Sequence, residues 1–346
     1  MARHGRRPYG RRMETRLIDV HDDEVCARAY EVIVASKDHE RPWNEPPSLA
    51  ETLVEWRHVD KAEPMEMWGA WDGEELVGVA TIWLPMSDNT SMVWHDVQVD
   101  PPHRGRGVGS ALVERIVSRA REEARPTLIT DLHVPPDSDD HPYRRFAEKH
   151  GFHLSNTEIM RHLPLPVAED LLDTHAERAR ARWEGTYRLE THVGGVPPEL
   201  RPSLCAVMNQ LAVDAPTGDI EFEAETLTPE RYEEYLEVFR QQGRVRLTTV
   251  AVEEASGDVV AYTDLMLPSG APSMAWQWGT LVHKAHRGRR LGMAVKVENL
   301  RRLQHDHPER RRVVTGNDDT NAWMVSINED LGFRIVELCP AYQRKL

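Results

Sequence analysis

Two basic, glycine-rich segments have the residue types that bind phosphate. The first is Arg104-Gly105-Arg106-Gly107-Val108-Gly109, and the second, at 287–292, reads Arg-Gly-Arg-Arg-Leu-Gly. Glycine lets the backbone turn tightly and bring its N–H groups close to a ligand. A helix that begins at such a loop adds unpaired N–H groups and a partial positive charge. Both segments therefore predict an anion site, although an ordinary tight turn between a strand and a helix would also explain the glycines.

The two segments belong to a longer repeat. Each follows a predicted strand that ends in valine, Val99 or Val282, and each is later followed by a Gly-Phe pair, at 151–152 or 332–333. Arg104 and Arg287 are separated by almost the same number of residues as Gly151 and Gly332. This register predicts a duplicated domain. The fold class is therefore two tandem α+β domains, each with a mixed, mostly antiparallel twisted sheet flanked by helices.

Hydrophobic periodicity predicts the same order of elements in both halves. The predicted strands lie at 14–20, 67–71, 76–83, 92–99 and 127–133, and again at 187–193, 246–252, 259–267, 276–282 and 312–315. The predicted helices lie at 22–36, 49–59 and 108–123, and again at 198–211, from 228 onward, at 291–305 and at 321–331. The Leu-Pro-Leu-Pro run at 163–166 marks a boundary between domains at 13–164 and 184–346, with a linker helix in 165–183.

Composition limits the partners of the chain. Its 346 residues are too many for one ordinary core, and no run approaches the roughly 20 apolar residues that span a bilayer. Residues 1–12 hold five arginines and predict a disordered basic extension, whereas the net charge of the whole chain is −14. Such an acidic body repels phosphate backbones and favours cationic small molecules, so neither nucleic acid nor membrane is expected as a partner. The three cysteines lack metal-ligand spacing, which indicates reduced thiols in a cytoplasm and no metal.

From Met13 onward the sequence resembles the GNAT superfamily of acyl-CoA-dependent N-acetyltransferases, and its two-domain plan resembles tandem GNAT proteins common in actinobacteria. The pyrophosphate loop of that superfamily reads Arg/Gln-x-x-Gly-x-Gly/Ala and opens the helix after the fourth strand. Arg104, Gly107 and Gly109 match this motif, whereas the second copy has Arg290 in place of the middle glycine. The resemblance implies acetyl-CoA as the acyl donor, bound where the fourth and fifth strands of a domain splay apart.

The resemblance also implies which residues hold acetyl-CoA. Backbone groups of Val97 and Val99, or of Val282, would pair with the pantetheine arm. Main-chain N–H groups of the loop and helix start would hold the pyrophosphate, namely those of Arg104, Gly105, Arg106, Gly107, Val108, Gly109 and Ser110, or of Arg287, Gly288, Arg289, Arg290, Leu291 and Gly292. Asn321 starts the late helix, where GNAT proteins often use asparagine to contact CoA. Arg290 requires a loop conformation that a side chain can tolerate.

Acid and base candidates follow from the same resemblance. Many members use a carboxylate on the fourth strand as the base and a tyrosine four residues before the Gly-Phe glycine as the acid. Ala147 and Asn328 stand at that tyrosine position, so neither half matches it. Tyr143, one helical turn earlier, could substitute, or could be a packing residue. Asp96 is the base candidate, or else a solvated strand end, and His95 beside it is the third catalytic candidate.

The first half is the predicted catalytic half, because the second has Gly279 at the position of Asp96. The second half is then either another active site or a degenerate copy that completes the acceptor pocket. The tryptophans in or near the strands predict core or interdomain packing, or an aromatic floor for a cationic amine. They are Trp68, Trp71, Trp83 and Trp94 in the first half and Trp276, Trp278 and Trp323 in the second. The leading hypothesis is an acetyl-CoA-dependent N-acetyltransferase acting on a small cationic amine, such as that of an antibiotic or natural product. A non-catalytic acyl-CoA-binding regulator and a protein N-acetyltransferase are the alternatives, and a homodimer stays open.

Overall fold

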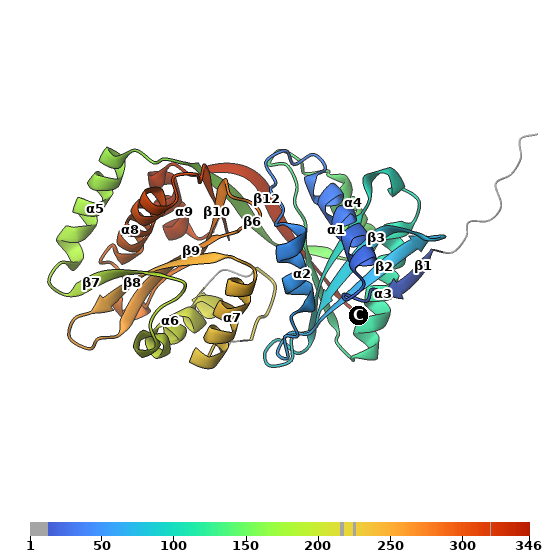
Figure 1. Ribbon diagram of the computed structural model, residues 1–346, viewed down its shortest axis with the longest axis horizontal. Coiled ribbons are helices and arrows are strands. Elements are labelled where there is room, and N and C mark those ends of the chain that lie inside the picture. The colour runs from blue at the N-terminus through green and yellow to red at the C-terminus, as the bar shows by residue number, and fades with distance from the viewer. Residues whose placement is uncertain (1–12, 215–217, 224–225, 319) are drawn as a thin grey trace, which may run out of the picture.

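The computed structural model describes residues 13–214, 218–223, 226–318 and 320–346. The basic extension predicted for residues 1–12 lies outside the described residues. Within them, twelve strands form one continuous sheet that passes through two lobes (Figure 1). Helices pack against the sheet in both lobes, so the predicted tandem α+β architecture is confirmed. No helix of these described ranges is both long and apolar enough to cross a membrane.

The strands of each half lie toward opposite ends of the sheet. From one edge inward, the first half contributes β1 (Glu14–Leu17), β2 (Met65–Asp72), β3 (Glu75–Trp83), β4 (Met92–Val99) and β5 (Thr127–Asp131). From the other edge inward, the second half contributes β7 (Tyr187–Val193), β8 (Val245–Glu253), β9 (Val259–Leu267), β10 (Met274–Val282) and β11 (Arg312–Asp318). Only β4–β5 and β10–β11 pair in parallel, and the other neighbours in the described sheet are antiparallel.

Both parallel pairs splay apart, as predicted. Strands β4 and β5 pair from Met92 opposite Thr127 to Trp94 opposite Ile129, and no register continues beyond these residues. Strands β10 and β11 pair over the equivalent short stretch, which ends at Trp276 opposite Val314. Each splay leaves unpaired backbone groups on the inner strand edges. These groups can bind an extended ligand, which makes each splay a natural place for a site.

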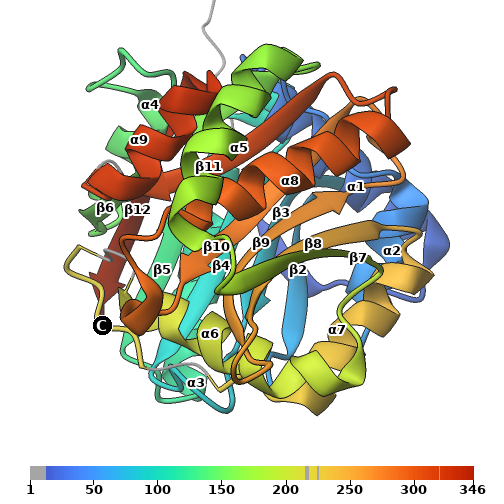
Figure 2. The same cartoon turned by 90° about the vertical axis from the view of Figure 1, so that its left-hand side faces the viewer.

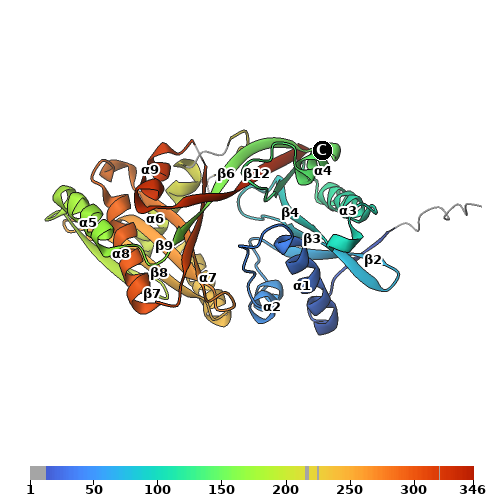
Figure 3. The same ribbon diagram turned by 90° about the horizontal axis from the view of Figure 1, so that it is seen from above.

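The two halves exchange their last strands at the centre of the sheet. Strand β6 (His153–Pro164) of the first half pairs with β11 of the second, and β12 (Arg334–Lys345) pairs with β5 of the first. The two exchanged strands also pair with each other. Figure 3 shows β6 and β12 running from one lobe to the other. The predicted ranges 13–164 and 184–346 therefore describe the repeat in the sequence, whereas the sheet joins the two ranges.

Helices cover both faces of the first-half sheet. The helices α1 (Asp23–Asp38) and α2 (Leu49–Arg57) lie on one face, and α3 (Val108–Glu122) and α4 (Pro142–Lys149) lie on the other (Figure 3). Alternate strand residues fill the two cores, because successive side chains of a strand point to opposite faces. Val79 packs with the α1 residues Ala29 and Val32, whereas Ile82 packs with Leu112 of α3.

The second half repeats this layering. The helices α6 (Arg201–Asp214) and α7 (Pro229–Gln241) correspond to α1 and α2, and α8 (Leu291–Asp306) and α9 (Ala322–Leu331) correspond to α3 and α4. The helix α5 (Glu169–Trp183) follows the first half and packs beside α8, which lies across β8 to β10 (Figure 2). Most predicted elements agree with the structure. The first strand ends at Leu17, short of the predicted residue 20, and the predicted helix 198–211 begins with a 3₁₀ turn at Pro198–Leu200.

Candidate active site

A cleft of about 640 Å³ opens where β4 and β5 splay apart in the first half. Its walls come from the end of α1, the strands β4 and β5, the start of α3, and α4. His95, Asp96 and Tyr143, the three predicted acid–base candidates, all line this cleft. Eight of the nine first-half residues predicted to hold the donor also line it, and Arg106 is the exception, with its side chain exposed to solvent. Most of the predicted first-half site residues therefore share one cavity, and their roles stay predictions.

The glycine loop forms one end of the cleft. Gly105 and Gly107 have φ of 74° and 88°, and open space surrounds the position that a Cβ of either would occupy. The first helical hydrogen bond of α3 runs from Ala111 N–H to the Gly107 carbonyl, so the N–H groups just before Ala111 have no partner in the helix. These N–H groups line a cavity at a helix N-terminus, which is where an anionic pyrophosphate binds favourably. The loop therefore fits the phosphates of an acyl-CoA.

Arg104 fixes the loop to its surroundings. Its Nε donates to the Val99 carbonyl at 3.3 Å, its guanidinium donates to the Tyr143 hydroxyl at 2.9 Å, and a third contact reaches the Ser36 hydroxyl at 3.1 Å. Tyr143 is therefore tied to the loop and to the end of α1. His141 caps α4 by accepting from the Tyr143 N–H, which positions the tyrosine at the first turn of that helix.

Asp96 lies on the α1 side of β4 and is already paired. Its carboxylate contacts the Lys37 Nζ at 3.0 Å and accepts from the Gln98 amide at 2.6 Å. Burial alone would raise the pKa of Asp96, but the Lys37 ammonium and the Gln98 amide outweigh burial and lower it below the ordinary value. Asp96 is therefore ionised and well hydrogen-bonded, which makes it a weak base.

Asp131 is a cleft residue that the sequence analysis did not single out. It is the last residue of β5, two residues beyond the last β4–β5 pair at Ile129, and its carboxylate makes no hydrogen bond or ion pair with any residue that the structure describes. Water reaches the side chain from the cleft, but the surrounding walls limit its hydration. This desolvation, with the nearby charges of Glu158 and Asp96, raises the pKa of Asp131 to about 7. The expected splay between the fourth and fifth strands, at 92–99 and 127–133, was the signal that could have found it.

His95 lies on the opposite face of β4 from Asp96. Its ring packs edge-on against Phe152 at 5.3 Å between centroids, and neither ring nitrogen has a hydrogen-bond partner in the described parts of the chain. Burial lowers the pKa of His95 to about 4, so the ring is neutral near pH 7. A neutral imidazole can offer one donor or one acceptor to a ligand in the cleft, but it cannot carry a positive charge there.

Aromatic side chains line the acceptor side of the cleft. Trp83 and Trp94 stand opposite each other on β3 and β4, on the same face as Asp96. Trp94 stacks on Phe222 of the second half, with ring centroids 5.7 Å apart and nearly parallel planes. Trp94 therefore packs between the two halves, as predicted for the tryptophans, and also contributes to the wall of the cleft.

The second half has the same loop with a different interior. Arg290, the N-cap of α8, has φ of 57°, so a side chain adopts the left-handed conformation that Gly107 adopts in the first copy. Residues 287–290 are exposed, whereas Leu291 and Gly292 are buried. Arg287 donates to the Val282 carbonyl at 3.2 Å, which repeats the anchor of the first loop. Asn321 caps α9 by accepting from the Met324 N–H at 3.2 Å.

A buried polar network fills the α8–α9 interior of the second half. Lys296 Nζ donates to Asn328 Oδ1 at 2.8 Å, and Asn328 Nδ2 donates to Asn317 Oδ1 at 3.0 Å. Arg161, from the exchanged strand β6, donates to the same Asn317 oxygen at 2.9 Å. Lys296 and Asn328 are fully buried. They occupy the positions that Val113 and Ala147 hold in the first half, where both residues line the open cleft.

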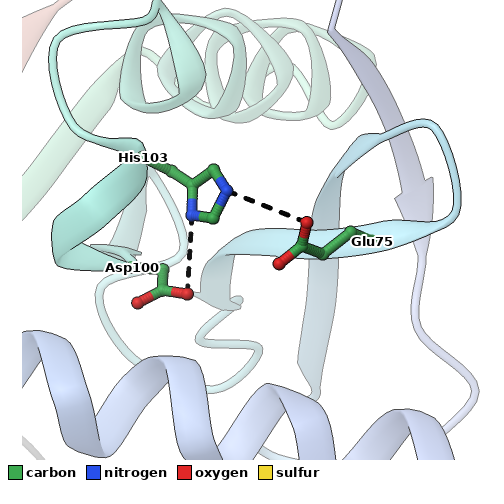
Figure 4. Close-up of side chains that lie close together, drawn as sticks. All are labelled: Glu75, Asp100 and His103. Carbon is green, nitrogen blue, oxygen red and sulfur yellow. Dashed lines mark ion pairs between the residues drawn. The ribbon is translucent and has the colours of Figure 1, made fainter.

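A charged cluster lies just after the last residue of β4, where His103 also lines the cleft. Glu75, Asp100 and His103 bring their ligand-type atoms within 4.8 Å of one another, which could hold a metal ion (Figure 4). His103 contacts the carboxylates of Asp100 and Glu75 at 3.5 and 3.8 Å. The Arg28 guanidinium already pairs with Asp100 at 2.6 Å and with Glu75 at 3.7 Å. This guanidinium supplies the positive charge that the carboxylates require, so the cluster is explained as an ion-pair network.

Comparisons with known proteins agree with this geometry. Residues 27–152 match the model of the acetyltransferase (GNAT) family. The chain is similar to a solved tandem GNAT protein from the clavulanic acid biosynthesis pathway, determined without AcCoA, with a TM-score of 0.79 at 24% identity over 96% of this chain and 98% of that one. It is also similar to a GCN5-related N-acetyltransferase from Sphaerobacter thermophilus, with a TM-score of 0.63 at 17% identity over 96% of each chain. No curated protein sequence matches significantly.

Proposed function

We propose that this chain, which belongs to the GNAT acetyltransferase family in its first half and has the tandem GNAT fold throughout, acetylates the primary amine of a small cationic molecule with acetyl-CoA as donor. One observation carries the proposal. A single cleft has a basic glycine loop and helix start at one end and carboxylates at the other. The first end suits an acyl donor with phosphates, and the second suits an acceptor with a positive charge.

The donor side assigns roles to the predicted residues. The free N–H groups from Gly105 to Ser110 would hold the pyrophosphate, and the unpaired edge of β4 at Val97 and Val99 would hydrogen-bond the pantetheine arm. This binding places the thioester at the splay, between the ends of β4 and β5. Holding the amine and the thioester in one orientation supplies a large part of the rate acceleration, because a reaction between two bound groups avoids the entropy cost of encounter.

The acceptor side favours a cation. Asp96 is ionised, and Trp83 and Trp94 present apolar rings beside it, which together stabilise an ammonium group better than a neutral one. The net charge of −14 adds a long-range attraction for cations. Amino groups of antibiotics or natural products have this character, and the cleft admits a compact molecule. Tyr143, held by Arg104, is the candidate that returns a proton to the departing thiolate.

Binding and turnover test the proposal directly. Calorimetry with acetyl-CoA is expected to give a saturable isotherm, and release of free thiol from acetyl-CoA is expected with some members of a panel of cationic amines. Asp96→Asn should weaken the apparent affinity for these amines and leave acetyl-CoA binding unchanged. The exposed Asp139→Asn is the matched control and should alter neither quantity. The proposal is wrong if acetyl-CoA does not bind, or if neutral acceptors are preferred to cationic ones throughout the panel.

A further inference from the structure

We infer that Asp131, rather than Asp96, is the catalytic base that takes the proton from the acceptor amine. This assignment rests on the proposed function and names one further residue of the same site. Its geometric basis is the position of Asp131 at the end of β5, where the parallel pairing with β4 stops and the cleft begins. A carboxylate at this position faces the gap in which the thioester and the amine must meet.

The two cleft carboxylates differ in what already binds them. Asp96 accepts from the Lys37 ammonium at 3.0 Å and from Gln98 at 2.6 Å, so taking a proton would cost it both charge-assisted contacts. The Asp131 carboxylate has no such contact to give up among the described residues and is open to the cleft. A base must take up a proton without weakening contacts that stabilise its charged form, and of the two cleft carboxylates Asp131 meets this condition.

The charges around Asp131 come from every element beside it. Asp96 lies across the splay on β4 and Glu158 lies on β6, with Asp318 of β11 near Glu158. The Glu158 carboxylate is directed over Gly316, where an added Cβ would lie 2.8 Å from its Oε2. The remaining groups that face this region are Lys37 at the end of α1, Arg41 after α1, His133 beyond β5, and Glu337 and Cys339 on β12.

These neighbours act in two opposing directions. The cations Lys37 and Arg41 are already paired, with Asp96 and with Glu337, and His133 also contacts Glu337 at 3.0 Å. The nearby charges that raise the pKa of Asp131 are therefore negative, with Glu158 the larger contributor and Asp96, which is paired with Lys37, the smaller. The limited hydration of the side chain between the cleft walls, followed by this negative charge, raises the pKa of Asp131 to about 7, which suits a base that works near neutral pH.

The step balances with the groups at hand. The acceptor arrives as an ammonium ion, and Asp131 takes one proton to leave a neutral amine. The amine nitrogen forms a bond to the thioester carbonyl carbon, and the carbon–sulfur bond breaks. The nitrogen loses its second proton, the thiolate gains one, and Asp131 finally releases its proton to water. The products are the N-acetylated amine and the free thiol of CoA, with no oxidant or reductant involved.

The first test compares variants at one pH. Asp131→Asn is expected to lower kcat about 10²- to 10⁴-fold near pH 7, the usual contribution of general base catalysis. Its affinity for acetyl-CoA should remain within about twofold of the parent value, because the donor binds on the β4 and α3 side. The defect should shrink as the pH approaches the pKa of the acceptor amine, since an already neutral amine needs no base. A purely structural role for Asp131 would give a defect that does not depend on pH.

The second test uses Glu158→Gln, which removes the like charge and leaves the cleft walls in place. In the parent protein, kcat/KM should rise with pH along a limb whose apparent pKa is near 7. This apparent pKa should be the same for acceptor amines of different pKa. In Glu158→Gln the limb should move to lower pH and the plateau should be kept, because losing a neighbouring negative charge lowers the pKa of Asp131. In Asp131→Asn this limb should disappear.

Three results would overturn the assignment of Asp131 as the base. The third of them would also overturn the proposed function. Asp131→Asn within tenfold of the parent rate at pH 7 would exclude Asp131 as the base. If the apparent pKa of the limb changes with the pKa of the amine, or is the same in Glu158→Gln as in the parent protein, the titrating group is not Asp131 and is assigned to the substrate. Absence of turnover with every amine would overturn the proposed function, and this assignment with it.

Discussion

The two halves share a scaffold but differ in the interior of the cleft. Both splay the same pair of strands, and both anchor the arginine of the loop to the last strand carbonyl. In the first half, small apolar side chains at Val113 and Ala147 leave the cleft open. In the second half, Lys296 and Asn328 stand at these positions and bond to each other inside the core. A duplicated domain can thus keep its fold while the side chains at two cleft positions change from small and apolar to buried and polar.

The carboxylates differ in the same way. Asp96 and Asp131 line the first cleft, whereas the second half has Gly279 and Gly316 at the equivalent places on β10 and β11. The second half instead supplies residues around the first cleft, because the exchanged strands bring β12 beside β5. The difference favours the hypothesis of one reaction centre per chain, in the first half, whose residues alone are found in the lining of the cleft among the described parts of the chain.

The largest expected effect comes from placing the second-half pair in the first cleft. Val113→Lys combined with Ala147→Asn should weaken acetyl-CoA binding at least about 100-fold, because the new side chains fill the cavity and overpacking costs about 1–3 kcal/mol at each site. Calorimetry measures the loss, and thermal melting confirms that the variant is folded. The reciprocal Lys296→Val with Asn328→Ala is the control. This control should bind one acetyl-CoA per chain with the affinity of the parent protein. If Val113→Lys with Ala147→Asn also binds acetyl-CoA with the parent affinity, the proposed difference between the two halves is wrong.

The buried lysine also predicts a pH dependence of stability that belongs to the second half. Burial lowers the pKa of Lys296 from its ordinary value of 10.5 to about 7. Between these pH values the unfolded chain binds a proton that the folded chain does not, so stability rises with pH across this window. The contribution approaches about 1.4 kcal/mol per pH unit, the slope for one proton. Lys296→Met should remove this slope.

Thermal melting between pH 7 and 10 measures the effect of Lys296→Met. The exposed Lys284→Met, at the second glycine loop, is the matched control and should keep the parent slope. An equal slope in the parent protein and in Lys296→Met would mean that Lys296 is not the group that links protons to folding.

A smaller effect is expected at the two loops themselves. Arg106 and Arg289 are exposed and occupy equivalent positions. Arg106→Glu should weaken acetyl-CoA binding about tenfold, since reversing one charge near a pyrophosphate costs about 1–2 kcal/mol in a largely aqueous setting. Arg289→Glu should leave binding within twofold. A higher salt concentration should reduce the difference in acetyl-CoA affinity between the two variants, because salt screens exposed charges. Equal losses in both would show that both loops bind the donor.

Local patterns predicted most elements of both halves, because periodicity and capping act within a few residues. Strand 92–99 and the start of the helix at Val108 agree with the structure to the residue. The strand exchange could not be read in this way. Strands β6 and β12 could pair with either half as far as their own residues show, and tertiary contacts decide between the partners. Asp131 and Lys296 were missed for a related reason, since their roles depend on which strands and helices surround them.

The smallest expected effect concerns the residue just before α3 and the residue just before α8, both of which have a left-handed backbone conformation. Arg290 has φ of 57° where the first half has Gly107 at 88°. A side chain in this region costs about 1 kcal/mol relative to glycine, part of which the greater freedom of glycine in the unfolded chain offsets. Arg290→Gly should therefore stabilise the protein by about 0.5 kcal/mol, and Gly107→Arg should destabilise it by a similar amount.

Melting temperatures of these two variants measure the strain, and acetyl-CoA binding separates strain from function. Because Lys296 and Asn328 still fill the second interior, Arg290→Gly should not add a second binding site although it restores the glycine of the motif. A second equivalent of acetyl-CoA bound by Arg290→Gly would show that the loop, and not the buried pair, closes the second cleft. In that case the loop residue Arg290, rather than the buried side chains of Lys296 and Asn328, would account for the difference in acetyl-CoA binding between the halves.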